Sequence, residues 1–173
     1  MAHLQEFNVN FGRLKVGKHS FEYKVDDKFF AEYEQELIEN CNTNTVLTID
    51  KTRLNLMKFS FKISGSADFA CDRCNEKRTY PLQGNFDILV KLQDEESTDD
   101  DIVFLSHDAY EYNIASLIYD FHILSIPFKK DCVHENHPTC LKIEELINNG
   151  SQPDNDVDDE EGDPRWNELR KLL

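Results

Sequence analysis

The sequence predicts an α+β domain built on a curved antiparallel β-sheet, a partial barrel, with two or three helices. Several stretches alternate aromatic or β-branched residues with polar ones, which is the two-residue period of half-buried strands. Other stretches have the three-to-four-residue period of amphipathic helices. A Cys-x-x-Cys motif lies between two of the alternating stretches, so a zinc-knuckle-like hairpin is expected there.

The strands are expected in the following order. A short strand pair is predicted from the alternating sets Phe7, Val9, Phe11 and Phe21, Tyr23, Val25. Further strands are predicted over residues 46–49, 54–63, 86–92 and 102–105. The run Asn42 to Asn44 is expected to separate elements, and Gly65 to mark a bulge or a close approach of two backbones.

Three helices are expected in the body of the chain. Asp26 and Asp27 offer an N-cap for a helix of about 12 residues. A second helix is predicted from about Asn113 to Ser125, ended by Pro127, with a buried stripe of Ile114, Leu117, Ile118, Phe121 and Leu124. A third, short helix is predicted over Leu141 to Ile147.

The 173 residues are expected to form one α+β domain over residues 1–150 with an acidic tail. Residues 94–101 hold six acids and predict a solvated loop. Residues 151–163 are predicted to be a disordered acidic linker. Residues 164–173 carry Trp166, Leu169 and Leu173 at helical spacing, and predict a docking helix too short to be stable alone.

The formal net charge of −15 indicates the kind of partner. Negative charge concentrates after residue 93, and a field of that sign repels nucleic acid and favours a basic partner. The first residues do not resemble a signal peptide, so a cytoplasmic location with reduced thiols is expected. No apolar run approaches the length of about 20 residues that a membrane helix needs.

The cysteines predict a metal site. Cys71 and Cys74 have the spacing at which one turn chelates a metal, and Cys132 and Cys140 could complete a tetrahedral set. His134 or His137 could replace Cys140 as the fourth ligand. The cofactor predicted on this basis is structural zinc. Unliganded reduced thiols are the main alternative, and a redox motif is a weaker one because the motif is not followed by a predicted helix.

The sequence carries no motif of a known catalytic site. It lacks Gly-x-Ser-x-Gly, His-Glu-x-x-His and a phosphate-binding glycine loop, so neither an enzyme nor a small-molecule substrate is expected. Pairing of Cys132 with His134 or His137 as a nucleophile has no orienting group to support it.

Direct RNA binding is an alternative function. Basic and aromatic residues mix around the 54–63 strand and the cysteine motif, which is a pattern of RNA-binding surfaces. They are Lys51, Arg53, Lys58, Lys62, Arg73, Lys77 and Arg78, with Phe59, Phe61 and Tyr80. The stronger interpretation places the aromatic rings in the core and the lysines on a solvated face.

Four segments resemble the YceD family, which is linked to accumulation of large-subunit ribosomal RNA. They are Ser64 to Cys74, the acidic loop with Ile102, Tyr112 to Pro127 leading to Cys132, and Asp163 to Leu169. Together they cover roughly residues 50–173. The chain departs from the family pattern at Asp120, where Glu is usual, and in having only Cys132 and Cys140 as its second cysteine group.

The resemblance implies a cytoplasmic bacterial protein that acts in ribosome production without an established catalytic activity. The function predicted is a non-enzymatic factor in large-subunit ribosomal RNA accumulation. Its expected partner is a basic protein, either a ribosomal protein or an assembly factor. The alternatives are a module that binds ribosomal RNA directly through the neutral N-terminal half, and a zinc-stabilised interaction domain unrelated to ribosomes.

Overall fold

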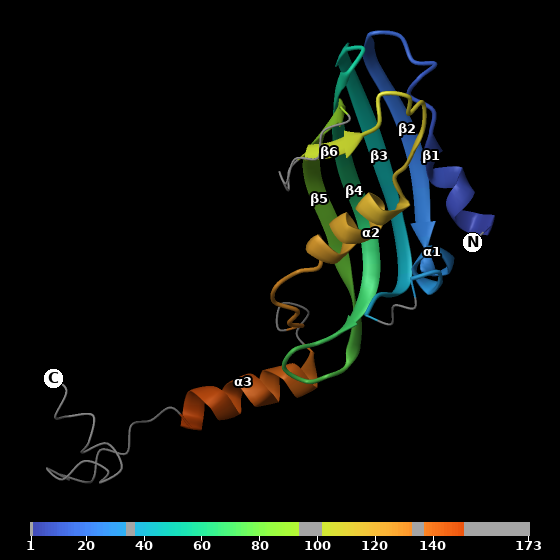
Figure 1. The fold of residues 1–173 in the computed structure, drawn as a ribbon. Helices are drawn as coiled ribbons and strands as arrows, with labels where there is room; N and C mark the ends of the chain where they lie inside the picture. Colours follow the sequence, from blue (N-terminus) through green and yellow to red (C-terminus); the bar gives the residue numbers. More distant parts are fainter. Residues whose placement is uncertain (1, 34–36, 94–101, 133–136, 151–173) are drawn as a thin grey trace, which may run out of the picture. The chain divides into compact units, whose positions relative to one another are not determined.

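The computed structural model describes residues 2–33, 37–93, 102–132 and 137–150 (Figure 1). The chain divides into two compact units, Met1–Cys132 and Val133–Leu173, each described here by itself. The predicted acidic loop, acidic linker and terminal docking helix lie outside the described residues, so they stay predictions.

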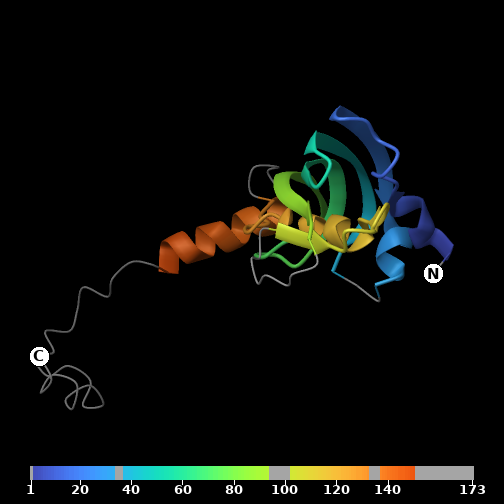
Figure 2. The ribbon, with the colours of Figure 1, turned by 45° about the horizontal axis from the view of Figure 1, so that its top comes forward.

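A five-stranded sheet forms the first unit. Its strands follow the order of the sequence, and they are β2 (Gly17–Asp26), β3 (Glu39–Arg53), β4 (Leu56–Ala70), β5 (Lys77–Leu92) and β6 (Ile102–Leu105). The first four make an antiparallel meander, and the sheet is visibly curved (Figure 2).

Two details of the predicted sheet are wrong. The sheet is open, with β2 and β6 as its edges among the described strands, so it does not close into a barrel. Strand β6 runs parallel to β5, from Leu89↔Ile102 to Leu92↔Leu105. The sheet is therefore mixed, because β2 to β5 pair antiparallel whereas β5 and β6 run in the same direction.

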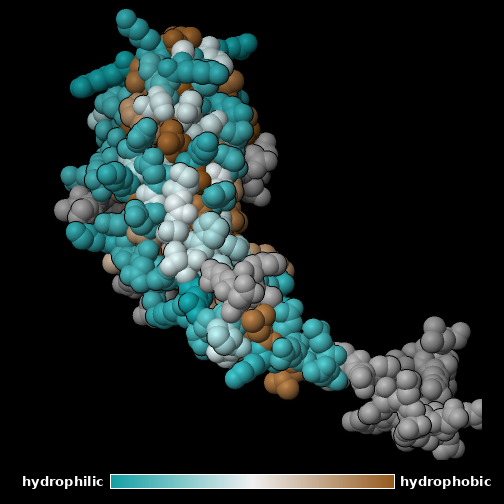
Figure 3. Space-filling view, turned by 180° about the vertical axis from the view of Figure 1, so that it is seen from behind, coloured by the Kyte–Doolittle hydropathy of each residue, from teal (hydrophilic) through white to brown (hydrophobic). Residues whose placement is uncertain are grey.

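The sheet has one apolar and one polar face. Alternate residues of the three long strands are buried, and they include Leu47, Ile49, Phe59, Phe61, Ile63, Leu82 and Val90. The opposite face, seen in Figure 3, shows mainly hydrophilic and intermediate residues. This confirms the predicted inward direction of the aromatic residues on β4, and it follows from the two-residue period of a strand.

Helix α2 (Ala115–Leu124) crosses the concave face of the sheet (Figure 1). Its position agrees with the predicted second helix. Ile118 is fully buried, but Leu124 is 67% exposed and the polar residue His122 is buried in its place. The buried stripe recurs every four residues, at positions 114, 118 and 122, so Leu124 points away from the sheet.

The N-terminal segment packs on the sheet through buried aromatic residues. It comprises the 3-10 helix η1 (Ala2–Phe7) and β1 (Asn8–Val9), which pairs with β7 (Tyr112–Asn113). Phe7, Val9 and Phe11 are buried. The predicted pairing of this segment with the 21–25 strand is wrong, because β2 pairs with β3.

Of the predictions for residues around β3, some are confirmed and some are wrong. Asp26 caps α1 (Asp27–Ala31) by accepting a hydrogen bond from the Lys28 N–H at 3.0 Å, as predicted, but the helix has only five residues. The run that begins at Asn42 does not separate two elements, because it lies inside β3. There Asn42 pairs with Asp26 of β2 and with Ser66 of β4. Gly65 marks the predicted close approach, since a Cβ atom there would lie 2.3 Å from the Asn42 carbonyl oxygen.

The second unit contains α3 (Pro138–Gly150). It includes the predicted 141–147 helix and starts three residues earlier, at a proline, which is favoured in the first turn. None of the helices in the described part of the chain is long and apolar enough to cross a membrane.

Candidate metal centre

Cys71 and Cys74 lie in the turn that joins β4 to β5, as the flanking alternation predicted. The Cys71 N–H donates to the Glu76 carbonyl oxygen at 2.9 Å, and the Asn75 N–H donates to the Cys71 carbonyl oxygen at 2.9 Å. Asn75 has a φ of 58°, a left-handed conformation that asparagine tolerates better than most residues. These bonds fold the chain tightly enough to bring both sulfurs to the inside of the turn.

The segment after α2 is fastened to this turn through Asp72. The Asp72 N–H donates to the Lys130 carbonyl oxygen at 2.7 Å, and the Lys130 N–H donates to the Asp72 Oδ2 at 2.7 Å. The Lys130 Nζ adds an ion pair to Asp72 Oδ1 at 3.4 Å. Lys130 lies two residues before Cys132. This set of contacts, the Asp72–Lys130 clasp, therefore positions a third sulfur beside the turn.

The three sulfurs of the first unit have the spacing of metal ligands. The Sγ atoms of Cys71, Cys74 and Cys132 all lie within 4.8 Å of one another. The Cys74 and Cys132 Sγ atoms are 3.6 Å apart. This separation is well beyond a disulfide bond of about 2.05 Å. Sulfurs about 2.3 Å from a tetrahedral zinc ion lie about 3.8 Å apart, so this part of the donor set fits the ion.

The turn also favours the thiolate form that binds metal. Burial alone would raise the pKa of the Cys71 thiol. Hydrogen bonds outweigh burial and lower this pKa to about 6; they come from the N–H groups of Cys74 and Arg73 and from the thiols of Cys132 and Cys74. Hydrogen bonds to the charged form have this effect, because they replace the water that burial removes.

The fourth predicted ligand belongs to the second unit. Cys140 is in the first turn of α3, and His137 immediately precedes that helix. His134 lies outside the described residues. The choice among these three residues therefore stays a prediction.

Comparison of the sequence with protein-family profiles tests the family resemblance of the four segments. The profile of the family described as large ribosomal RNA subunit accumulation protein YceD matches residues 59–173. The chain belongs to the YceD family. The match includes the cysteine turn, α2 and Cys132. Comparison with curated proteins found no match, and neither did comparison with solved structures.

Membership of the YceD family assigns the protein to a group described by ribosomal RNA accumulation and not by a reaction. The cysteine turn is followed by β5, so this motif does not have the helix N-terminus found at the thiols of redox proteins of the thioredoxin type.

Three of the residues in the predicted RNA-binding surface are buried, namely Lys51, Phe59 and Phe61. Phe59 and Phe61 are buried in the core and cannot stack on bases. Lys51 is only 4% exposed, and its Nζ donates to the carbonyl oxygens of Phe11 at 3.0 Å and Leu14 at 3.1 Å. The inclusion of Lys51 in a basic surface was wrong, because this side chain fastens the loop before β2 to the sheet. Lys58 does lie on the polar face, where it pairs with Asp87.

Sequence analysis missed a pocket that opens beside the cysteine turn. Its walls come from four separate segments of the first unit. No motif marks it, because none of its residues is unusual within its own segment.

Proposed function

We propose that this protein is a non-enzymatic factor that maintains large-subunit ribosomal RNA in the cytoplasm by binding a basic protein of the ribosome or of its assembly. The observation that carries the proposal is the YceD family match over residues 59–173. The net charge of −15 supports a basic partner over nucleic acid, since like charges repel.

Depletion of the protein in its own cells tests the proposal. The ratio of large-subunit to small-subunit ribosomal RNA is expected to fall, with fewer free and assembled large subunits in sucrose gradients. Re-expression of the wild-type chain is expected to restore both. Unchanged RNA ratios and subunit profiles after depletion would contradict the proposed role.

The cysteine turn supports this function structurally, in our proposal, by holding zinc. Cys71, Cys74 and Cys132 supply three thiolates, and Cys140 the fourth, with His137 or His134 as the substitute. The length of the connection between Cys132 and Cys140 is compatible with this assignment, because eight residues can span up to about 27 Å and so allow the fourth thiol to reach the other three. Zinc prefers four such ligands in structural sites.

Metal analysis of the purified protein tests the zinc assignment. One zinc per chain is expected in wild type, and close to none in Cys71→Ser. Cys140→Ser and His137→Ala distinguish these two candidates for the fourth ligand. Only substitution of the true ligand is expected to weaken the retention of zinc against a chelator. A native wild-type protein that contains no metal would overturn the assignment.

A further inference from the structure

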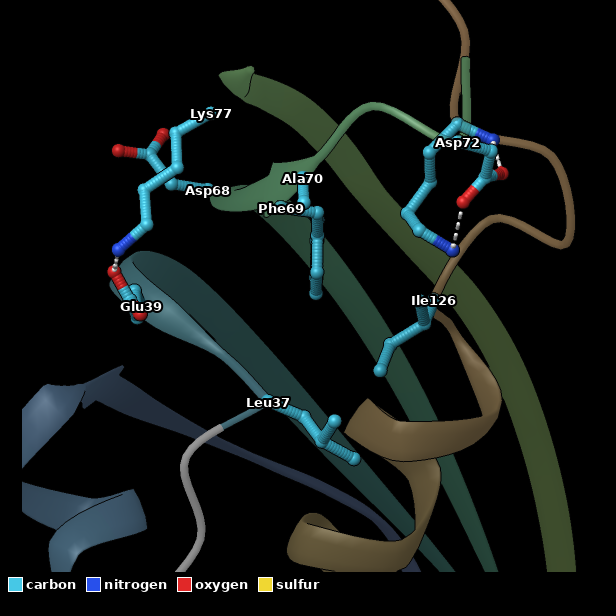
Figure 4. Close-up of a pocket in the computed structure, with 9 residues that line it drawn as sticks. Leu37, Glu39, Asp68, Phe69, Ala70, Asp72, Lys77 and Ile126 are labelled. Atoms are coloured by element: carbon cyan, nitrogen blue, oxygen red, sulfur yellow. Dashed lines mark hydrogen bonds and ion pairs between the residues drawn. The ribbon is translucent and has the colours of Figure 1, made fainter. Parts of the chain in front are cut away.

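A pocket of about 460 Å³ opens next to the cysteine turn, entirely within the first unit (Figure 4). Its volume is in the range that accommodates a bulky side chain or a small ligand. The lining residues are Leu37, Glu39, Asp68, Phe69, Ala70, Asp72, Lys77, Ile126 and Lys130.

The inside of the pocket is apolar. Leu37, Phe69 and Ile126 point toward its centre from the residues just before β3, the end of β4 and the segment after α2 (Figure 4). Leu37 is 69% exposed, and Phe128, two residues beyond Ile126, is completely exposed. Large apolar side chains gathered at a hollow with a polar rim are typical of protein interaction sites.

The rim carries charges that are mostly matched within the protein. Lys77 forms an ion pair with Glu39, and Lys130 forms one with Asp72. The remaining carboxylate is that of Asp68. Its two oxygens accept hydrogen bonds from uncharged groups, the Thr79 hydroxyl at 2.5 Å and the Asn40 Nδ2 at 2.7 Å.

Asp68 is therefore a fixed negative charge beside an apolar hollow. The hydrogen bonds from Thr79 and Asn40, with a smaller contribution from the nearby charge of Lys77, lower the pKa of this carboxyl, so it is ionised at neutral pH. The rim as a whole has three carboxylates and two ammonium groups, which disfavours an anionic ligand. The described side chains that point into the pocket, those of Leu37, Phe69 and Ile126, carry no polar groups that would orient a small polar substrate.

We propose that this pocket binds a large apolar side chain of a partner protein, next to a lysine or arginine of the same segment that pairs with Asp68. The charge of the rim complements such a segment, and the hollow buries its apolar residue. The inference rests on the proposed function and extends it by locating the contact with the basic partner.

Peptide binding to the full-length protein tests the inference. The probe is the fluorescein-labelled peptide Gly-Ser-Arg-Trp-Arg-Ser-Gly, followed by fluorescence anisotropy. Two control peptides replace either Trp by Ala or both Arg by Glu. The Arg-Trp-Arg probe is expected to bind at least about fivefold more tightly than either control, because each loses one of the two recognised features.

Matched variants place the binding in the pocket. Leu37→Ser is expected to weaken binding of the probe about fivefold, whereas Leu54→Ser, at a leucine of similar exposure between β3 and β4, leaves it unchanged. Asp68→Asn is expected to reduce the preference for Arg over Glu to within about twofold. Asp87→Asn removes an exposed carboxylate from the polar face and is expected to retain the preference.

Four results would overturn the inference. They are equal binding of all three peptides, equal effects of the Leu37 and Leu54 variants, self-association that Leu37→Ser abolishes, and a tenfold gain in probe affinity in Trp166→Ala. The third result would assign the pocket to a second copy, and the fourth to the terminus of the chain itself. The ribosomal RNA ratio after depletion is measured without any peptide, so failure of the docking site and failure of the proposed function are distinguishable.

Discussion

Two buried cysteines show how differently the core and the cysteine turn treat the same side chain. Cys41 is 4% exposed and Cys71 is 2% exposed. Burial raises the pKa of Cys41 to about 11, and a hydrogen bond with Thr43 only partly offsets this effect. At Cys71 the surrounding N–H groups and thiols reverse the effect of burial and lower the pKa to about 6. The direction of nearby donors, and not burial, decides which thiol is ready to bind metal.

The core cysteine belongs to a polar network beneath α2. The Cys41 Sγ lies 3.8 Å from the Thr43 Oγ1, and that oxygen lies 2.8 Å from the His122 Nε2. The His122 Nδ1 lies 2.7 Å from the Ile118 carbonyl oxygen, which can only accept. In the neutral ring Nδ1 therefore carries the proton, and Nε2 accepts from the threonine hydroxyl. This network stabilises neutral groups, whereas the turn stabilises thiolates.

The largest expected difference between the two regions is in metal binding and stability. Cys71→Ser is expected to remove the bound zinc and to lower the free energy of unfolding by several kcal/mol, because metal binding contributes directly to folding. Metal analysis and thermal unfolding measure the two effects. Cys41→Ala is the control, and it is expected to retain one zinc per chain. Zinc loss in both variants would remove the contrast.

Thiol labelling compares the regions without metal. In chelator-treated native protein at pH 7, a brief pulse of N-ethylmaleimide is expected to label the cysteine turn at least about a hundredfold faster than Cys41, since thiolate is the reactive form. Peptide mass spectrometry reports the sites. Prior unfolding in guanidinium should equalise the rates, and rapid native labelling of Cys41 would contradict the assignment.

The core network predicts a loss of stability in mild acid. Burial lowers the pKa of His122 in the folded state, so below pH 6.5 the unfolded state binds more protons than the folded state. The contribution of His122 to the free energy of unfolding is therefore fully present above the pKa of this histidine in the unfolded chain. It decreases as the pH falls through that value. Urea unfolding at pH 7 and pH 5.5 measures this difference, which His122→Gln should diminish and His19→Gln should retain.

Removal of the hydroxyl that binds His122 tests the same network at constant pH. Thr43→Val is expected to cost about 1–3 kcal/mol at pH 7, because it leaves a buried nitrogen without its donor. The zinc content is expected to remain at the wild-type value. A stability cost below the error of urea unfolding would show that the hydrogen bond is not maintained in solution.

The smallest expected effect concerns the Asp72–Lys130 clasp. Asp72→Asn is expected to cost at most about 1 kcal/mol, since Asp72 is about half-exposed and its ion pair with Lys130 is 3.4 Å long. It is nevertheless expected to accelerate zinc loss to a chelator, because the clasp positions Cys132. Asp87→Asn, which removes a comparable pair with Lys58, should leave the rate of zinc loss unchanged. Equal rates in both variants would mean that the clasp does not hold Cys132 in place.

The sequence predicted those features that depend on local period and spacing. The cysteine turn, α2, and the inward direction of Phe59 and Phe61 could all be read from a few neighbouring residues. The parallel β5–β6 pair could not, because alternation gives the face of a residue but not the direction of the next strand. The burial of Lys51 depends on carbonyl groups 37 and 40 residues away.

The same limit applies to the candidate site. Cys71 and Cys74 were recognisable from their spacing, and Cys132 from chemistry alone. The position of Cys132 beside them depends on the Asp72–Lys130 clasp, which no periodicity encodes. The pocket was not predictable, because it forms only where four segments meet. The pairing of β3 on both sides overrode the turn tendency of Asn42 in a similar way.

The hairpin of β4 and β5 has a consequence for the order of folding. The two strands pair from Ala70↔Lys77 next to the cysteine turn to Leu56↔Lys91 at the far end, so the hairpin forms through contacts near in sequence. Cys132 is 58 residues beyond Cys74, and α2 lies between them in the sequence. A nascent chain therefore offers two thiolates first and a third much later. We expect zinc uptake to complete folding and not to start it, so that loaded metal marks a chain whose first unit is finished.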